Sequence, residues 1–237
     1  MILLLSGEGP SDMGRCDHQN GFKPGPMALF VDQLVERHLA FSCLETGCVR
    51  FISEQALTDF GKKLVQRKSP RLPGKKYQKE TCFFERNAQA LAVKAQELAA
   101  EVSDEVISVL FRDADGTALT CRGLYEKKRD SMVRGFELQG YLKGIPMIAK
   151  PKSEAWLLCA VKPNPYSHCD ALESTSGNDS SPNALKQQLE KALSGHIGSW
   201  GLAEMVSDGT IDVHRIDMPS LNWFKERLNQ TLNVDAP

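Results

Sequence analysis

The chain has 237 residues, enough for one large domain or for a domain with a sizeable insertion. Hydrophobic residues make up 41% of it and charged residues 25%, which is ordinary for a soluble globular protein. The formal net charge of −1 excludes a global field that would draw the whole molecule to nucleic acid, so any nucleic-acid surface must be local.

The chain is expected to be cytoplasmic and to make no contact with a membrane. The apolar run at residues 1–5 is too short for the core of a signal peptide and has no basic region before it. No segment approaches the length of a membrane span.

Seven cysteines are scattered along the chain without a C-x-x-C pair. An odd count with irregular spacing favours a reduced compartment over a disulfide scaffold. We therefore expect small buried hydrophobic groups and surface thiols. A zinc site built from pairs such as Cys16 and His18 is the less favoured alternative, because ligand pairs at zinc-finger spacing are missing.

The first predicted strand, residues 2–5, is followed by a loop that carries acids. Glu8 lies between two glycines, and Asp12 follows four residues later. The glycine spacing fits neither dinucleotide-binding nor P-loop motifs. A carboxylate in such a loop would also repel phosphate, so the loop suits a metal ion better than a nucleotide.

The next predicted elements are a loop at residues 21–25, a helix at 26–40, a strand at 49–52 and a helix at 56–67. A proline at position 26 suits the first residue of the helix, whose apolar side chains recur at helical spacing. His38 on this helix is more readily a surface or partly buried histidine than a metal ligand.

A run of basic residues without any acid begins in the second of these helices. Two prolines and a glycine in its second half predict a loop. A solvated loop and a contact surface for the phosphate backbone are equally good readings of the run. Its eight basic residues are Lys62, Lys63, Arg67, Lys68, Arg71, Lys75, Lys76 and Lys79.

The central strand is predicted at residues 106–111, after an alanine-rich helix at 84–101. This short apolar run is typical of a buried strand in a parallel sheet. Asp113 and Asp115 come next. Side chains two residues apart on an extended chain face the same side, so both acids can face one point beyond the strand end, where open α/β sheets bind ligands.

Further helices and one strand complete the prediction. A helix at residues 122–142 and a strand at 145–149 precede Ser153, which can cap a helix that starts at Glu154. Glu154 could line the metal site, or it could only stabilise the helix by its position near the positive end of the helix dipole. A long loop is expected at 162–183, followed by helices at about 183–194 and 220–232.

Three motifs in this order resemble the Toprim domain, the metal-dependent catalytic core of topoisomerases, primases and OLD-family nucleases. They are residues 7–12 (GEGPSD), 111–116 (FRDADG) and 150–158 (KPKSEAWLL). The resemblance covers roughly residues 1–160. Residues 216–224 (IDMPSLNWF) are also similar to the end of small stand-alone Toprim-like proteins.

The element order and the resemblance together predict an α/β fold with a mainly parallel central sheet flanked by helices. Residues 1–160 would form the Toprim-like core, with a basic insertion at about 44–80. Residues 161–237 would form a loop and a helical extension packed on the same domain. The insertion is longer than a bare Toprim core, and no large DNA-binding module is present.

The leading functional hypothesis is a nuclease that hydrolyses DNA or RNA with Mg²⁺ or Mn²⁺, metals that suit hard oxygen ligands. Topoisomerases need a partner tyrosine and a strand-passage domain, and primases need zinc and template-binding parts, whereas a nuclease needs only metal and water. The expected metal ligands are Glu8, Asp113 and Asp115, with Asp12 or Glu154 completing a second site. Lys150 or Lys152 would neutralise charge on the phosphate.

Two other functions remain open. The chain could be a non-catalytic subunit that regulates a partner, and the resemblance implies that a separately encoded ATPase and a role in phage defence are to be considered. It could also be a phosphatase with Asp113 as nucleophile, since residues 113–117 fit the pattern D-x-D-x-T. In that case Glu8 would have no role.

Overall fold

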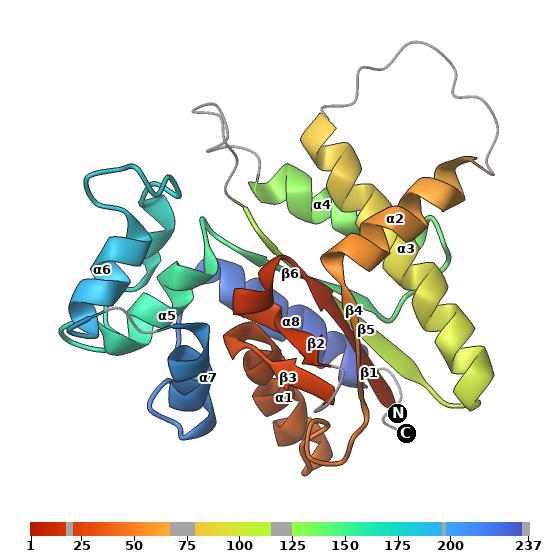
Figure 1. The fold of residues 1–237 in the computed structure, drawn as a ribbon, viewed down its shortest axis with the longest axis horizontal. Helices are drawn as coiled ribbons and strands as arrows, with labels where there is room; N and C mark the ends of the chain where they lie inside the picture. The colour runs from red at the N-terminus through yellow and green to blue at the C-terminus, as the bar shows by residue number, and fades with distance from the viewer. Residues whose placement is uncertain (18–20, 67–78, 115–124, 196–197, 234–237) are drawn as a thin grey trace.

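A computed structural model describes residues 1–17, 21–66, 79–114, 125–195 and 198–233. Its centre is a four-stranded, all-parallel sheet in the order β4-β1-β5-β6 (Figure 1). These strands are β4 (Val49–Ser53), β1 (Ile2–Gly7), β5 (Val106–Asp113) and β6 (Gly144–Ala149). The predicted α/β class with a parallel sheet is confirmed.

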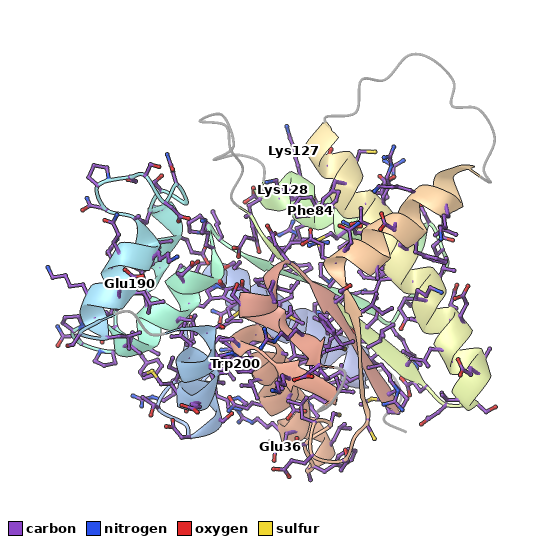
Figure 2. All side chains as sticks on the ribbon, in the orientation of Figure 1. Glu36, Phe84, Lys127, Lys128, Glu190 and Trp200 are labelled. Carbon is purple, nitrogen blue, oxygen red and sulfur yellow. A yellow bond between two sulfur atoms is a disulfide. The ribbon has the colours of Figure 1, made fainter. Side chains whose placement is uncertain are left out.

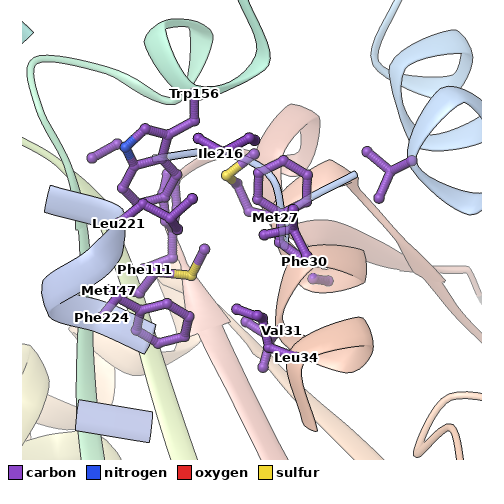
Figure 3. Close-up of a cluster of buried hydrophobic side chains, with 14 of the residues drawn as sticks. Met27, Phe30, Val31, Leu34, Phe111, Met147, Trp156, Ile216, Leu221 and Phe224 are labelled. Atoms are coloured by element: carbon purple, nitrogen blue, oxygen red, sulfur yellow. The ribbon is translucent and has the colours of Figure 1, made fainter. Parts of the chain in front are cut away.

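Helices cover both faces of the sheet, which explains why β1, β5 and β6 are largely apolar runs. One face packs against α2 (Glu54–Gln66), α3 (Lys79–Val102) and α4 (Tyr125–Glu137). The other packs against α1 (Pro26–Leu39) and α8 (Pro219–Asn233). Figure 3 shows this second core, where Phe111 and Met147 of the sheet meet Phe30 of α1 and Phe224 of α8.

The carboxyl-terminal third contributes to the same hydrophobic core as the amino-terminal strands. Leu185 and Leu189 of α6 (Leu185–Ala192) and Val206 of α7 (Ser199–Ser207) belong to the cluster that contains Leu3 and Phe111. These helices after residue 161 therefore pack on the sheet through shared apolar side chains.

The sequence does not predict the hairpin of β2 (Gly14–Asp17) and β3 (Gly21–Pro24), which replaces the loop expected at residues 21–25. Neither four-residue strand has an apolar pattern long enough to stand out. Phe22 docks the hairpin on β4 by stacking on Phe51, with ring centroids 4.7 Å apart. Short helical segments η1 (Gly9–Met13), η3 (Asp170–Ser174) and α7 were also not predicted.

Two predicted helix boundaries are corrected. The helix expected over 122–142 ends at Glu137, because Gly140 adopts a positive φ and the N–H of Tyr141 returns to the carbonyl of Phe136. Ser153 is not the cap of the next helix. It is the first residue of α5 (Ser153–Val161), and Lys152 occupies the cap position without a side-chain hydrogen bond.

The expectation of unpaired cysteines is wrong for Cys159 and Cys169, which form a disulfide. A turn brings the two residues together, because the N–H of Tyr166 donates to the carbonyl of Cys159 (2.8 Å) and so folds the chain back on α5. Four other cysteines in the described part of the chain are free: Cys16, Cys43, Cys48 and Cys82. No helix in the described residues is long and apolar enough to cross a membrane.

Candidate functional site

Glu8 and Asp113 lie side by side at the carboxyl edge of the sheet. Strands β1 and β5 are neighbours, and Gly7 is in register with Phe111. The N–H of Glu8 donates to the carbonyl of Phe111 (3.3 Å), and the N–H of Asp113 donates to Glu8 Oε2 (3.4 Å). The two acids that the sequence predicted at strand ends are therefore brought together, as expected for parallel strands.

Glycines allow the loop after β1 to fold tightly against this edge. A Cβ on Gly7 would lie 2.5 Å from Met13 Cγ and 2.8 Å from Phe111 Cβ. A Cβ on Gly25, at the start of α1, would lie 2.3 Å from the carbonyl oxygen of Asp12. Side chains at these positions would push η1 outward, so the glycines determine where Asp12 lies.

Ser153 connects two of the acids, and it is almost completely buried. Its N–H donates to Asp113 Oδ1 (2.9 Å), and its hydroxyl donates a short hydrogen bond to Asp12 Oδ1. The first N–H groups of a helix have no partner within the helix and attract negative charge. Asp113 thus satisfies the amino terminus of α5 from another strand, and η1, β5 and α5 meet at one point.

Burial and mutual repulsion weaken the acidity of two carboxyl groups here. The pKa of Asp12 is raised by burial and further by the charge of Glu8, against hydrogen bonds from Ser153 and Ser11. The pKa of Glu154 is raised by burial and by the charge of Asp12. Within the described residues, Glu154 Oε2 is buried without a hydrogen-bond partner. Both carboxyl groups therefore hold a proton more readily than exposed ones do, unless a cation compensates their charge.

The two lysines predicted to contact phosphate already make other interactions. Lys152 Nζ donates to Asp179 Oδ1 (3.0 Å), and its side chain is only 15% exposed. Lys150 Nζ lies 5.4 Å from the ring centroid of Tyr125. Lys152 also lowers the pKa of Asp12, although less than burial raises it. It is therefore the lysine that interacts with the acidic edge.

Two buried cations near the end of β5 were not assigned a site role from the sequence. Arg112 is 1% exposed, points to the α2–α3 face, and pairs with Glu54 at 3.0 Å. Lys128 of α4 is equally buried, and its Nζ donates to the carbonyl of Ala114 (2.9 Å). Figure 2 shows Lys128 beside Phe84. The ammonium group of Lys128 thus contacts the backbone of the residue that follows Asp113.

Part of the predicted site lies outside the residues that the structure describes. Asp115 lies outside the described residues, as do Arg67, Lys68, Arg71, Lys75 and Lys76 of the basic run, and no side chain is described for Lys79. Lys62 and Lys63 are exposed on α2, and Lys62 pairs with Asp59 at 2.8 Å. His38 contacts Asn229 at the surface (2.7 Å), in agreement with its predicted structural role.

In the part of the chain that the structure describes, no three histidine, cysteine, aspartate or glutamate side chains converge closely enough to hold a metal ion. The predicted set of Glu8, Asp113 and Asp115 therefore stays a prediction, since one member is not placed. Comparison of the chain with protein-family models, curated proteins and solved structures finds no significant match.

Proposed function

We propose that this protein is a divalent-metal-dependent nuclease that hydrolyses phosphodiester bonds of DNA or RNA. The observation that carries the proposal is the hydrogen-bonded arrangement of Glu8 and Asp113 at the carboxyl edge of a parallel sheet, with Asp12 joined to Asp113 through Ser153. Four carboxylates, counting Glu154, gather around this edge from three connections of the sheet. Four carboxylates repel a nucleic-acid phosphate, so this edge can bind such a substrate only when divalent cations lie between the carboxylates and the phosphate.

The electrostatics of the edge fit a hard divalent cation. The pKa values of Asp12 and Glu154 are raised mainly by burial and further by neighbouring carboxylates, Lys152 offsets only part of this rise, and the buried Oε2 of Glu154 has no donor among the described residues. Glu8, Asp113 and Asp115 would hold one Mg²⁺ or Mn²⁺ ion, and Asp12 and Glu154 a second. When bound, such ions polarise the scissile phosphate and lower the pKa of an attacking water.

The protein's own residues would orient the acids and bind the substrate. Ser153 holds Asp113 and Asp12 in fixed positions, which limits the reorganisation needed during the reaction. Lys152 would exchange Asp179 for a phosphate oxygen, and Lys150 would reach the phosphate from the ring of Tyr125. The basic run that starts at Lys62 would contact the nucleic-acid backbone away from the reacting phosphate.

The proposed cellular role rests on the Toprim resemblance. A small nuclease of this kind would work with a separately encoded ATPase and would serve defence against phage. Its proposed place of action is the cytoplasm, as expected from the sequence. The chain itself has no Walker A motif for binding ATP, so the ATPase would have to be a separate protein. Co-purification of the tagged protein with an ATPase would support this extension.

A cleavage assay tests the proposal directly. Plasmid DNA, single-stranded DNA and RNA are incubated with the protein in Mg²⁺, Mn²⁺ or chelator, and with Glu8→Gln and Asp113→Asn variants. Glu101→Gln, an exposed acid at the end of α3, is the matched control for loss of one charge. We expect metal-dependent cutting by the wild type and the control only.

Two results would contradict the nuclease proposal. The first is the absence of metal-dependent cutting on all three substrates. The second is a covalent phosphate or phosphate mimic on Asp113, which would establish the phosphatase alternative.

A further inference from the structure

A tryptophan and two cations form an exposed surface beside the acidic edge. Trp200 of α7 is 45% exposed, although tryptophan is usually well buried. The guanidinium carbon of Arg15 lies 5.4 Å from its ring centroid, and Lys23 Nζ lies 5.8 Å from it. Figure 2 shows Trp200 where α7 meets the β2–β3 hairpin. We call these three residues the Trp200 surface.

Trp200 is not needed to dock α7. The helix buries Ala203 and Val206, and Gln33 of α1 donates to the carbonyl of Val206 (2.8 Å). The inner face of the helix is therefore occupied by other residues, and the indole is left partly in solvent at the outer end. An aromatic ring that is exposed and flanked by cations is a feature of nucleic-acid binding surfaces.

The Trp200 surface lies close to the acidic edge, because α7 contacts η1, the segment that carries Asp12. Asp12 belongs to η1, which leads directly into β2, and Arg15 follows three residues later. Three residues of extended chain span at most about 11 Å. The hairpin is held against the sheet by the Phe22–Phe51 stack, so the cations keep a fixed relation to the carboxylates.

The two cations differ in what they already contact. Lys23 Nζ forms an ion pair with Asp17 Oδ2 across the hairpin at 3.2 Å, so its charge is partly compensated. Arg15 is exposed on the opposite strand and contacts the indole. Arginine binds phosphate through a planar fork of donors and also stacks on aromatic rings. Arg15 is therefore the better candidate for a phosphate contact.

We propose that the Trp200 surface binds an unpaired strand of the substrate, with one base stacked on Trp200 and a neighbouring phosphate held by Arg15. This inference rests on the proposed nuclease function and names its substrate class: single-stranded or locally unpaired nucleic acid. Bases in a duplex are stacked within it and offer no free face to a side chain. Every base has a flat face, so this contact does not require a particular sequence.

Binding is measured separately from cleavage by the anisotropy of a dye-labelled single strand of DNA, in Ca²⁺ so that a cation compensates the carboxylates, and on a time scale over which the strand stays intact. The same sequence as RNA and as duplex DNA completes the set. We expect Trp200→Ala to raise the Kd for the single strands about 5- to 150-fold, and to leave the Kd for the duplex unchanged. Trp200→Phe keeps a ring and is expected to recover much of the affinity.

Two further variants give the test its controls. Phe41→Ala removes an aromatic ring that is 42% exposed at the end of α1, and it is expected to have no effect. The salt dependence of single-strand binding is the slope of the logarithm of the binding constant against the logarithm of the salt concentration. Arg15→Ala should make this slope shallower by about 0.7. Trp200→Ala should leave the slope unchanged, because stacking releases no counterions.

The outcomes separate this inference from the proposed function. If Trp200→Ala binds single strands as well as the wild type, if it weakens duplex binding equally, or if the wild type binds no single strand, the Trp200 surface is not a strand-binding site. Trp200-dependent binding without any metal-dependent cleavage would support the surface and contradict the nuclease. The tighter of the DNA and RNA complexes identifies the sugar of the substrate.

Discussion

The N–H of Ser153 donates a hydrogen bond to Asp113 Oδ1 over 2.9 Å, so the carboxylate that ends β5 also caps α5. One side chain thus has a structural role and a proposed metal-binding role. The two roles respond differently to substitution. An amide keeps an acceptor oxygen for the helix but loses the charge that a metal ion requires.

Asp113→Asn is expected to abolish cleavage while the protein stays folded, because the amide still accepts the Ser153 hydrogen bond. Asp113→Ala removes the acceptor as well and should cost about 0.5–2 kcal/mol of stability. Thermal melts with and without Mg²⁺ measure both effects. The wild type should gain stability from the metal and the variants much less. Equal gains in the wild type and both Asp113 variants would show that Asp113 does not bind metal. The Asp115→Asn variant is expected to behave like Asp113→Asn.

Gly7→Ala is expected to destabilise the protein by about 1–3 kcal/mol, because the new methyl group meets Met13 and Phe111 at the site edge. Gly61→Ala in α2 is the control, since its nearest neighbour would be Ala90 Cβ at 3.5 Å. Alanine is the better helix former, so the control should be neutral or slightly stabilising. Chemical denaturation measures both; an unaffected Gly7→Ala variant would mean that the loop packs less closely than described.

The stability of the metal-free protein should depend on the charge of Asp12. Burial raises its pKa above the ordinary 3.8, so the folded state holds the proton more tightly than the unfolded state. The resulting stabilisation is present below the unfolded pKa and is lost as pH rises through the folded pKa. Asp12→Asn has no such loss and should become more stable relative to the wild type as pH rises. Melts in chelator from about pH 4 to about pH 7 test this. A difference that does not change with pH would contradict it.

Neutralising the basic run at residues 62–79 is expected to weaken nucleic-acid binding without changing metal binding. The run has eight cations and no acid. For each lost phosphate contact on duplex DNA, the slope of the logarithm of the binding constant against the logarithm of the salt concentration should become shallower by about 0.9. Binding titrations at several salt concentrations measure the slope, and metal-induced melting shifts provide the control. An unchanged slope would identify the run as a solubilising segment.

Removing the Cys159–Cys169 disulfide should lower stability. The bond joins residues separated by 10 positions, and the entropy of closing such a loop corresponds to about 3 kcal/mol in the unfolded chain. The double serine variant should melt lower than the wild type without reductant and match it with reductant. Cys82→Ser, which changes a free thiol on α3, is the control. Identical melts of the wild type with and without reductant would contradict a bond that stabilises the fold.

Local patterns were enough to predict the four strands of the parallel sheet and the position of two site residues. The apolar runs before Glu8 and Asp113 end where acids and glycines begin, and a strand ends at such a change of composition. Because parallel strands present their carboxyl ends at one edge, this was also enough to predict that the two acids are neighbours.

Contacts between distant segments were decided only by the tertiary structure. Ser153 was expected to cap its own helix, yet its N–H and hydroxyl are used by Asp113 and Asp12. Nothing near Cys159 indicates that Cys169 will reach it, and Trp200 meets Arg15 only because α7 packs beside the hairpin. Periodicity reports which side of an element is apolar, and that is a local property. Which elements meet depends on packing the whole core, so the sequence determined the acids at the strand ends and the fold determined what surrounds them.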